Sequence, residues 1–163
     1  MIADVQIAVD DPRRPDIRAL LGRHLEFTRG QTPAEHSFAL EWDGLLDQAI
    51  TFFSCRAGNN LLGVVALKRL GPDHAEVKSM HTAEAVRGRG VGRVMLIHLL
   101  VTARDRGYRR LSLETGTTAG FAPARALYRA AGFVTCGPFA DYQPSHHNLF
   151  MTVELDAVHL TGD

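Results

Sequence analysis

The spacing of apolar and polar residues changes several times along this chain, and each change predicts an element of structure. Alternation over residues 5–9 predicts a first β-strand. From Arg14 to Thr28 the apolar residues recur at helical spacing, which predicts an amphipathic helix. The stretch from Pro33 to Leu46 has no sustained period, and we expect a short helix followed by a loop there.

The middle of the chain is rich in β-branched and aromatic residues and predicts an antiparallel meander. Three runs favour strands, namely residues 49–56, 61–70 and 75–82. Turn-forming residues separate these runs at Gly58–Asn60 and Gly71–Asp73, so neighbouring strands are expected to form hairpins.

The second half of the chain alternates between helical and strand patterns. Helical spacing covers residues 90–105 and 123–131, and Gly107 and Gly132 suit the C-terminal ends of these helices. Short β-forming runs occupy residues 111–115, 133–134 and 149–155. This order predicts a mixed α/β sheet whose parallel part brackets the glycine-rich connection before residue 90.

Length and composition favour a single soluble domain over residues 1–163. The 18 basic and 18 acidic side chains give zero formal net charge, which argues against a nucleic-acid partner. The N-terminus lacks a signal-peptide pattern and no apolar run is long enough to span a membrane, so we expect a cytoplasmic protein with no membrane partner. Cys55 and Cys136 form no CxxC pair, and we interpret both as buried or half-buried apolar side chains.

A glycine-rich basic segment, Val86–Arg93, leads directly into the helix predicted over residues 90–105. The first N–H groups of a helix lack intrahelical partners and the helix dipole favours negative charge there, so this segment predicts a site for a phosphate or pyrophosphate. It lacks the Gly-Lys-Ser/Thr of a Walker A loop, and Arg93 stands where a dinucleotide-binding fingerprint needs glycine or alanine. From these residues alone, an ordinary turn on a basic surface is the alternative.

Two motifs follow one another along the chain. The first is Arg87-x-x-Gly90-x-Gly92 after a predicted strand, and the second is Ala124–Phe133, in which a Leu-Tyr pair precedes Gly-Phe. Together they resemble the motifs of the GNAT superfamily of acyl-CoA-dependent N-acyltransferases. The resemblance covers residues 48–156, whereas residues 1–47 lie where such proteins vary with their acceptor. The strings at 76–80, 113–116 and 149–152 are similar to small bacterial members of undefined substrate. The resemblance implies a mixed, mostly antiparallel sheet of about seven strands with a splayed parallel pair, flanked by about four helices.

The resemblance also implies acetyl-CoA as a co-substrate and no metal. The pyrophosphate of CoA would lie on the backbone N–H groups of Arg89–Arg93, and the pantetheine arm would pair like an extra strand with Met80–Thr82. A backbone N–H of Met80–Thr82 would then polarise the thioester carbonyl. The implied cofactor-binding residues are Met80, His81, Thr82, Arg87, Gly88, Arg89, Gly90, Val91, Gly92 and Arg93.

Tyr128 aligns with the tyrosine that such enzymes use as a general acid toward the departing thiolate. A phenol keeps its proton near neutral pH, so it can supply that proton when the sulfur needs it. Glu76 is the first candidate for the general base that deprotonates the acceptor, and Glu114, His81 and a chain of waters are alternatives. Glu76 could instead form an ion pair with Lys78.

One position departs from the family pattern. Phe121 stands where many members carry an asparagine that holds the pantetheine or the substrate. We expect a threonine within residues 115–118, or the backbone, to replace that contact.

The implied function is transfer of an acetyl group from acetyl-CoA to an amine by direct attack within a ternary complex. A small molecule is favoured over a protein as acceptor, and the open edges of such a sheet are compatible with a homodimer. The alternative is a non-catalytic module that binds or senses acyl-CoA. Candidates for the acceptor side are Glu41, Trp42, Phe139, Tyr142 and Pro144.

Overall fold

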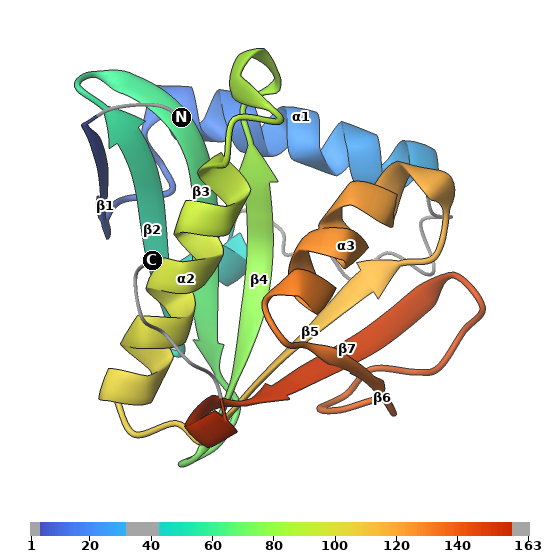
Figure 1. The fold of residues 1–163 in the computed structure, drawn as a ribbon. Coiled ribbons are helices and arrows are strands. Elements are labelled where there is room, and N and C mark those ends of the chain that lie inside the picture. Colours follow the sequence, from blue (N-terminus) through green and yellow to red (C-terminus); the bar gives the residue numbers. More distant parts are fainter. Residues whose placement is uncertain (1–3, 32–42, 158–163) are drawn as a thin grey trace.

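The structure is a computed structural model that describes residues 4–31 and 43–157, so Glu41 and Trp42 lie outside the described residues. Seven strands form one sheet in the order β1-β2-β3-β4-β5-β7-β6 (Figure 1). These strands are β1 (Val5–Val9), β2 (Ile50–Ala57), β3 (Asn60–Arg69), β4 (His74–Thr82), β5 (Arg110–Gly116), β6 (Val134–Cys136) and β7 (Asn148–Glu154). The α-helices within the described ranges are α1 (Pro15–Gln31), α2 (Val91–Asp105) and α3 (Ala122–Ala130).

The sheet is antiparallel except between β4 and β5, which confirms the predicted mixed sheet with one parallel pair. The parallel pair is short: it runs from His74 opposite Arg110 to Glu76 opposite Ser112. Both strands continue past this ladder: β4 ends at Thr82 and β5 ends at Gly116. They therefore splay toward their C-terminal ends, as the two arrows in Figure 1 show.

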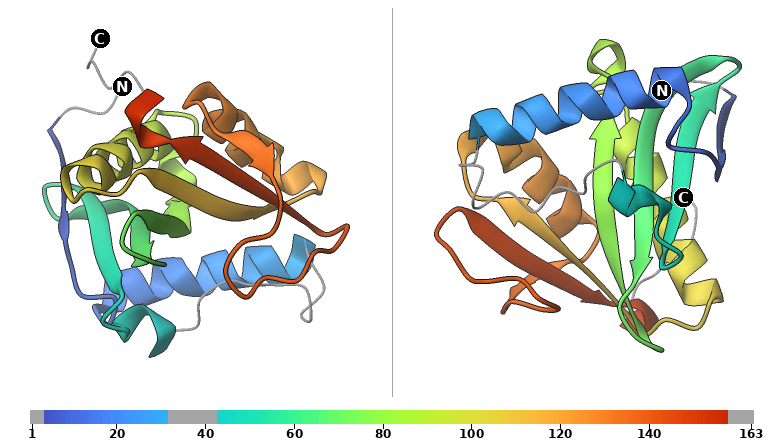
Figure 2. Two further views of the ribbon diagram at one scale, coloured as in Figure 1. Left: turned by 90° about the horizontal axis from the view of Figure 1, so that it is seen from below. Right: turned by 180° about the vertical axis from the view of Figure 1, so that it is seen from behind.

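Helices cover both faces of the sheet. The two helices that follow the parallel strands, α2 and α3, lie on one face, and α1 crosses the opposite face (Figures 1 and 2). None of the helices in the described ranges is long and apolar enough to cross a membrane.

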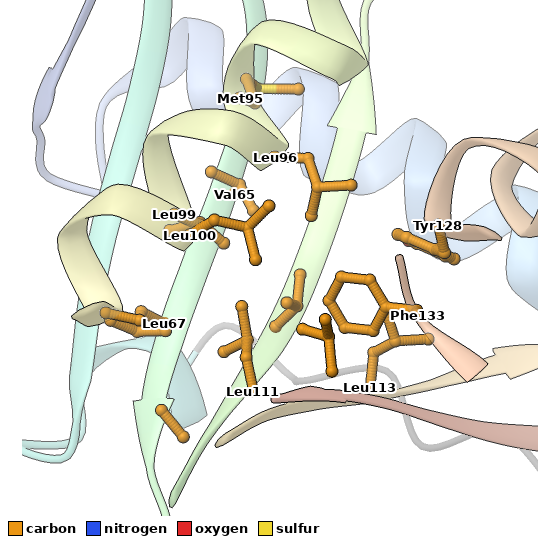
Figure 3. Close-up of a cluster of buried hydrophobic side chains, with 14 of the residues drawn as sticks. Val65, Leu67, Met95, Leu96, Leu99, Leu100, Leu111, Leu113, Tyr128 and Phe133 are labelled. Carbon is orange, nitrogen blue, oxygen red and sulfur yellow. The ribbon is translucent and has the colours of Figure 1, made fainter. Parts of the chain in front are cut away.

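The main core lies between the sheet and the helices α2 and α3 (Figure 3). Leu96 and Leu100 of α2 are buried there with inward-facing residues of the strands, such as Val65 and Leu111. A smaller cluster under α1 contains Ile17, Leu20, Leu21, Leu45, Phe52, Val64 and Ala66. Because β3 contributes to both clusters, its apolar run is nearly continuous rather than alternating.

The regular elements predicted from the sequence are confirmed, with ends displaced by one to a few residues. The helix predicted over residues 90–105, for example, is α2, and Gly107 follows it with a φ angle of 89°. Gly132 after α3 likewise has a φ of 101°, which suits the left-handed residue that ends many helices. Cys55 is buried and Cys136 half-buried, as expected, and both are free thiols.

The prediction of about four helices is wrong, because the described residues contain three α-helices and several short 3₁₀ turns. The sequence predicts a further short helix within residues 33–46, of which the structure describes only 43–46. That part forms a 3₁₀ turn, Asp43–Leu46, which contains Gly44. Glycine disfavours a helix interior and 3₁₀ geometry rarely extends beyond one turn, so Asp43–Leu46 does not continue as an α-helix toward β2.

Candidate functional site

The glycine turn forms an open cradle at the N-terminus of α2. Gly88 and Gly90 have positive φ angles of 79° and 90°, and Gly90 is the N-cap residue of the helix. A Cβ atom added at either glycine would have nothing within 4 Å, so the backbone is accessible to a ligand. The side chains of Arg87, Arg89 and Arg93 are exposed in and next to this turn, and the first N–H groups of α2 lack intrahelical partners. This combination suits a phosphate or pyrophosphate.

Three elements converge at Gly92, in the first turn of α2. A Cβ atom at Gly92 would lie 3.1 Å from Cδ2 of Leu127 in α3 and 3.7 Å from Oγ1 of Thr82 in β4. Arg87 also contacts the end of β4, since its Nε donates a 3.5 Å hydrogen bond to the carbonyl of Thr82. The structure thus brings together the cradle, the strand expected to receive the pantetheine arm, and the helix that carries Tyr128.

A β-bulge interrupts β4 shortly before its end. Val64 of β3 lies opposite His81 and Ala66 opposite Lys78, so β4 has one extra residue in this interval. Ser79 within the bulge has a φ of 54°, a region that non-glycine residues rarely adopt. Beyond it, Met80 packs against the main core on the α2 face. A bulge takes its extra residue out of the ladder, and this one lies directly before Met80–Thr82, where the sequence predicted polarisation of the thioester carbonyl.

Tyr128 lies near the end of α3 and is 7% exposed. Its ring centroid lies 5.9 Å from that of Phe133, and Figure 3 shows both side chains beside the core leucines. Burial, together with the negative charge of Glu114, raises the pKa of Tyr128 well above its usual value. The phenol therefore keeps its proton near neutral pH.

Glu76 occupies the last paired position between β4 and β5 and is almost completely buried. The hydroxyl of Tyr142 donates a hydrogen bond to Oε2 of Glu76. Nζ of Lys78 lies 3.4 Å from the same oxygen and donates a 2.6 Å hydrogen bond to the Tyr142 hydroxyl. The predicted alternative of an ion pair between Glu76 and Lys78 is therefore confirmed, and Tyr142 joins it.

Glu114 is the second carboxylate beside the splay. It is half-buried on β5, two residues beyond Ser112, and so it lies on the same face of the sheet as Glu76. Burial raises the pKa of Glu114 to about 7; the nearby charge of Lys78 lowers it and that of Glu76 raises it. A carboxyl group that titrates near neutral pH is suited to proton transfer.

The connection between β6 and β7 folds over the α1 face of the sheet (Figure 2). The ring centroid of Tyr142 lies 5.2 Å from that of Phe139 and 5.6 Å from that of Phe150. Phe150 is directly opposite Glu114 in the β5–β7 ladder, so this aromatic group borders both carboxylates. The sequence suggested Phe139, Tyr142 and Pro144 as candidates for the acceptor side, but it did not reveal the hydrogen bond from Tyr142 to Glu76. No local pattern links residues 66 positions apart.

Phe121, the departure from the family pattern, packs against the end of β5. A Cβ atom at Gly116 would lie 2.2 Å from Cδ2 of Phe121, so the ring occupies the space that a side chain at position 116 would need. Nη1 of Arg125 donates to the carbonyls of Gly116 and Thr118 at 2.8 and 2.9 Å, which fixes this connection. The hydroxyl of Thr117, one of the expected replacements, donates to the carbonyl of His146 instead.

Asn148 is a residue that the sequence analysis missed. It pairs with Gly116 at the start of β7 and is 6% exposed. Neither Nδ2 nor Oδ1 of its side chain has a hydrogen-bond partner within the described part of the chain. Because buried amides are normally paired, this one is a candidate for contact with an acceptor.

The site therefore has two sides that meet at the splay between β4 and β5. The cradle and Tyr128 belong to the α2–α3 face, and Glu76, Glu114 and Tyr142 belong to the α1 face. His81, the remaining candidate base, is buried beyond the bulge, opposite Val64. Among residues 4–31 and 43–157, no group of three or more His, Cys, Asp or Glu side chains is placed to hold a metal.

Comparisons with known proteins agree with this geometry. The chain is 43% identical over 149 residues to the uncharacterized N-acetyltransferase YedL of Escherichia coli (strain K12), covering 91% of this chain and 94% of that protein. It is 41% identical over 151 residues to the uncharacterized N-acetyltransferase YsnE of Bacillus subtilis (strain 168), covering 93% and 100%.

A solved structure shares the fold over almost the whole chain. It is a protein from Klebsiella pneumoniae subsp. pneumoniae MGH 78578, provisionally described as an acyl-CoA N-acyltransferase. The two superimpose with a TM-score of 0.75 at 26% identity, covering 93% of this chain and 97% of the other. Residues 15–133 match the Acetyltransferase (GNAT) family, and with relatives of this similarity the chain belongs to that family.

Proposed function

We propose that the protein transfers an acetyl group from acetyl-CoA to the amine of a small molecule by direct attack within a ternary complex. One observation carries this proposal: an open anion cradle and a carboxyl group that titrates near neutral pH lie on opposite sides of the same splay. Membership of the GNAT family and relatives named N-acetyltransferases support it.

The cradle fits CoA because it offers helix N–H groups and arginine side chains, which are the groups that bind a pyrophosphate. Backbone N–H groups of Val91–Arg93 would hold the pyrophosphate, and Arg87 and Arg89 would add charge. The bulge in β4 would present a backbone N–H of Met80–Thr82 to the thioester oxygen. Bound acetyl-CoA supplies an activated acetyl group.

We assign the general base to Glu114 rather than to Glu76, the first candidate from the sequence. Glu76 already holds a hydrogen bond from Tyr142 and an ion pair with Lys78. Glu114 has no such ion pair within the described residues, and its pKa of about 7 suits removal of a proton from an ammonium ion. Tyr128, across the splay, would then protonate the thiolate that leaves.

Direct attack is favoured over a covalent acetyl-enzyme. Cys55 is buried in the main core and Cys136 lies on the short edge strand β6, so neither thiol borders the splay. A nucleophilic cysteine would need an accessible place beside both the thioester and a base.

The decisive experiment measures acetyl-CoA binding and acceptor-dependent thiol release separately. Because Glu114 must be deprotonated to accept a proton, kcat/KM should rise with pH and level off above about 7. The Glu114→Gln variant should bind acetyl-CoA like the wild type in titration calorimetry, yet lose about 10²- to 10⁴-fold in kcat with a library of small amines.

The matched control is Glu154→Gln, the same change at an exposed position of β7. This variant should leave both measurements unchanged. Binding of acetyl-CoA without thiol release for any amine would instead support the sensing module. Full turnover by Glu114→Gln, with its pH profile intact, would remove Glu114 from the mechanism.

A further inference from the structure

Glu76, Lys78 and Tyr142 form a closed hydrogen-bonded group beneath the β6–β7 connection. Each member contacts the other two: Lys78 donates to Tyr142 at 2.6 Å, Tyr142 donates to Glu76, and the ion pair between Lys78 and Glu76 measures 3.4 Å. The side chains of Glu76 and Lys78 are 2% and 9% exposed. Charges this deeply buried are costly unless each is compensated, and here one positive charge compensates one negative charge.

Aromatic packing fixes the position of this group relative to Glu114. The ring of Tyr142 is held between Phe139 and Phe150, and Phe150 is the cross-strand partner of Glu114. Lys78 Nζ also lies 5.2 Å from the centroid of the Tyr142 ring. The ammonium ion is therefore held in a defined place beside the second carboxylate.

We propose that Glu76, Lys78 and Tyr142 act together as a positioning group that sets the protonation state of Glu114, so that Glu114 alone exchanges a proton with the acceptor. This inference rests on the proposed role of Glu114 as the base. Lys78 neutralises Glu76 while remaining close enough to favour the ionised form of Glu114. Tyr142 keeps Lys78 next to Glu76. It thereby prevents a direct ion pair between Lys78 and Glu114. Such an ion pair would suppress proton uptake by Glu114.

Among the described residues, the titratable groups that interact with Glu114 come from three parts of the fold. Glu76 and Lys78 lie on β4, Tyr142 on the β6–β7 connection, and Tyr128 on α3. Lys68 of β3 lies opposite Glu76 and acts on Lys78 rather than on Glu114. Among these groups, Lys78 favours the ionised form of Glu114 and Glu76 opposes it.

The test removes each charge in turn and follows Glu114 directly. Lys78→Met should shift the titration of Glu114 to higher pH, and Glu76→Gln should shift it to lower pH, each by about one pH unit. The carboxyl carbon resonance of Glu114 reports this pKa by NMR in the full-length protein, whether or not Glu114 is the base. The rising limb of kcat/KM against pH should move in the same directions.

Lys68→Met is the matched control, because it removes the same charge from the neighbouring strand on the same face. It should leave the Glu114 resonance unshifted. Tyr142→Phe keeps every charge and therefore tests positioning: release of Lys78 toward Glu114 should lower the pKa of Glu114 and raise KM for the amine more than it changes kcat. This variant also serves if Lys78→Met does not fold.

The outcomes separate this inference from the proposed function. Shifts in one common direction, or no shift in Lys78→Met and Glu76→Gln, would overturn the positioning group. Opposite shifts in the NMR titration, without matching movement of the kcat/KM limb, would support the group and overturn Glu114 as the base.

Discussion

Tyr128 offers the most specific test at the scale of single residues. Replacing it with phenylalanine removes only the hydroxyl, and its ring stays packed beside Phe133. In the proposed mechanism the phenol protonates the thiolate that leaves, so we expect kcat to fall by about 10²-fold or more while acetyl-CoA affinity stays similar. Steady-state kinetics and titration calorimetry measure the two quantities. The control is Tyr108→Phe, the same change beside the main core, which should leave kcat unchanged. Unchanged turnover in Tyr128→Phe would exclude the Tyr128 phenol as the general acid.

The choice between Glu76 and Glu114 shows what residue-level reasoning could reach from the sequence. Both carboxylates could be identified, because Glu76 lies on the predicted strand before the glycine turn and Glu114 at the end of the next predicted strand. Their different partners could not be predicted, because Tyr142, which donates a hydrogen bond to Glu76, lies 66 positions away. The raised pKa of Glu114 comes mainly from burial in the folded chain, which no local pattern shows.

At the scale of elements, the connection from β5 to α3 depends on the absence of a side chain at Gly116. A methyl group there would overlap the ring of Phe121, whose Cδ2 lies 2.2 Å from the Cβ position. We expect Gly116→Ala to lower the free energy of unfolding by about 1–3 kcal/mol, measured by urea denaturation. The same change in a Phe121→Ala background should cost much less, and equal costs in both backgrounds would contradict this contact.

The same scale explains which parts of the fold were predictable. α2 and the strands could be predicted because their apolar periods reflect burial on one or both faces. The bulge at Ser79 could not, because serine rarely takes a positive φ and tertiary packing imposes it. The course of the β6–β7 connection likewise depends on Tyr142 and its buried partners rather than on a local pattern.

At the scale of the whole molecule, Glu114 should make the protein less stable as the pH rises. Its native pKa of about 7 exceeds that of an unfolded glutamate, so the native state binds the proton more tightly and stability falls between about pH 4 and 7. Glu114→Gln should therefore increase the free energy of unfolding at pH 8 by about 1–3 kcal/mol. Below about pH 4, urea denaturation should give the same free energy of unfolding for the wild type and Glu114→Gln, because the wild-type carboxyl group is protonated in both the native and the unfolded state. Equal stability of the two proteins at pH 8 would mean that this carboxylate is well solvated.

Only the positions from His74 to Glu76 pair β4 with β5. The half of the sheet that ends at β4 and the half that begins at β5 are therefore held together mainly by packing in the core. On the proposed function, an acetyl-CoA arm paired along β4 would bind the native state and not the unfolded chain. Such binding adds about 2.7 kcal/mol to the free energy of unfolding at a hundred times Kd. The lifetime of this protein against cellular proteases would then follow the acetyl-CoA supply, so its abundance would report the metabolic state of the cell.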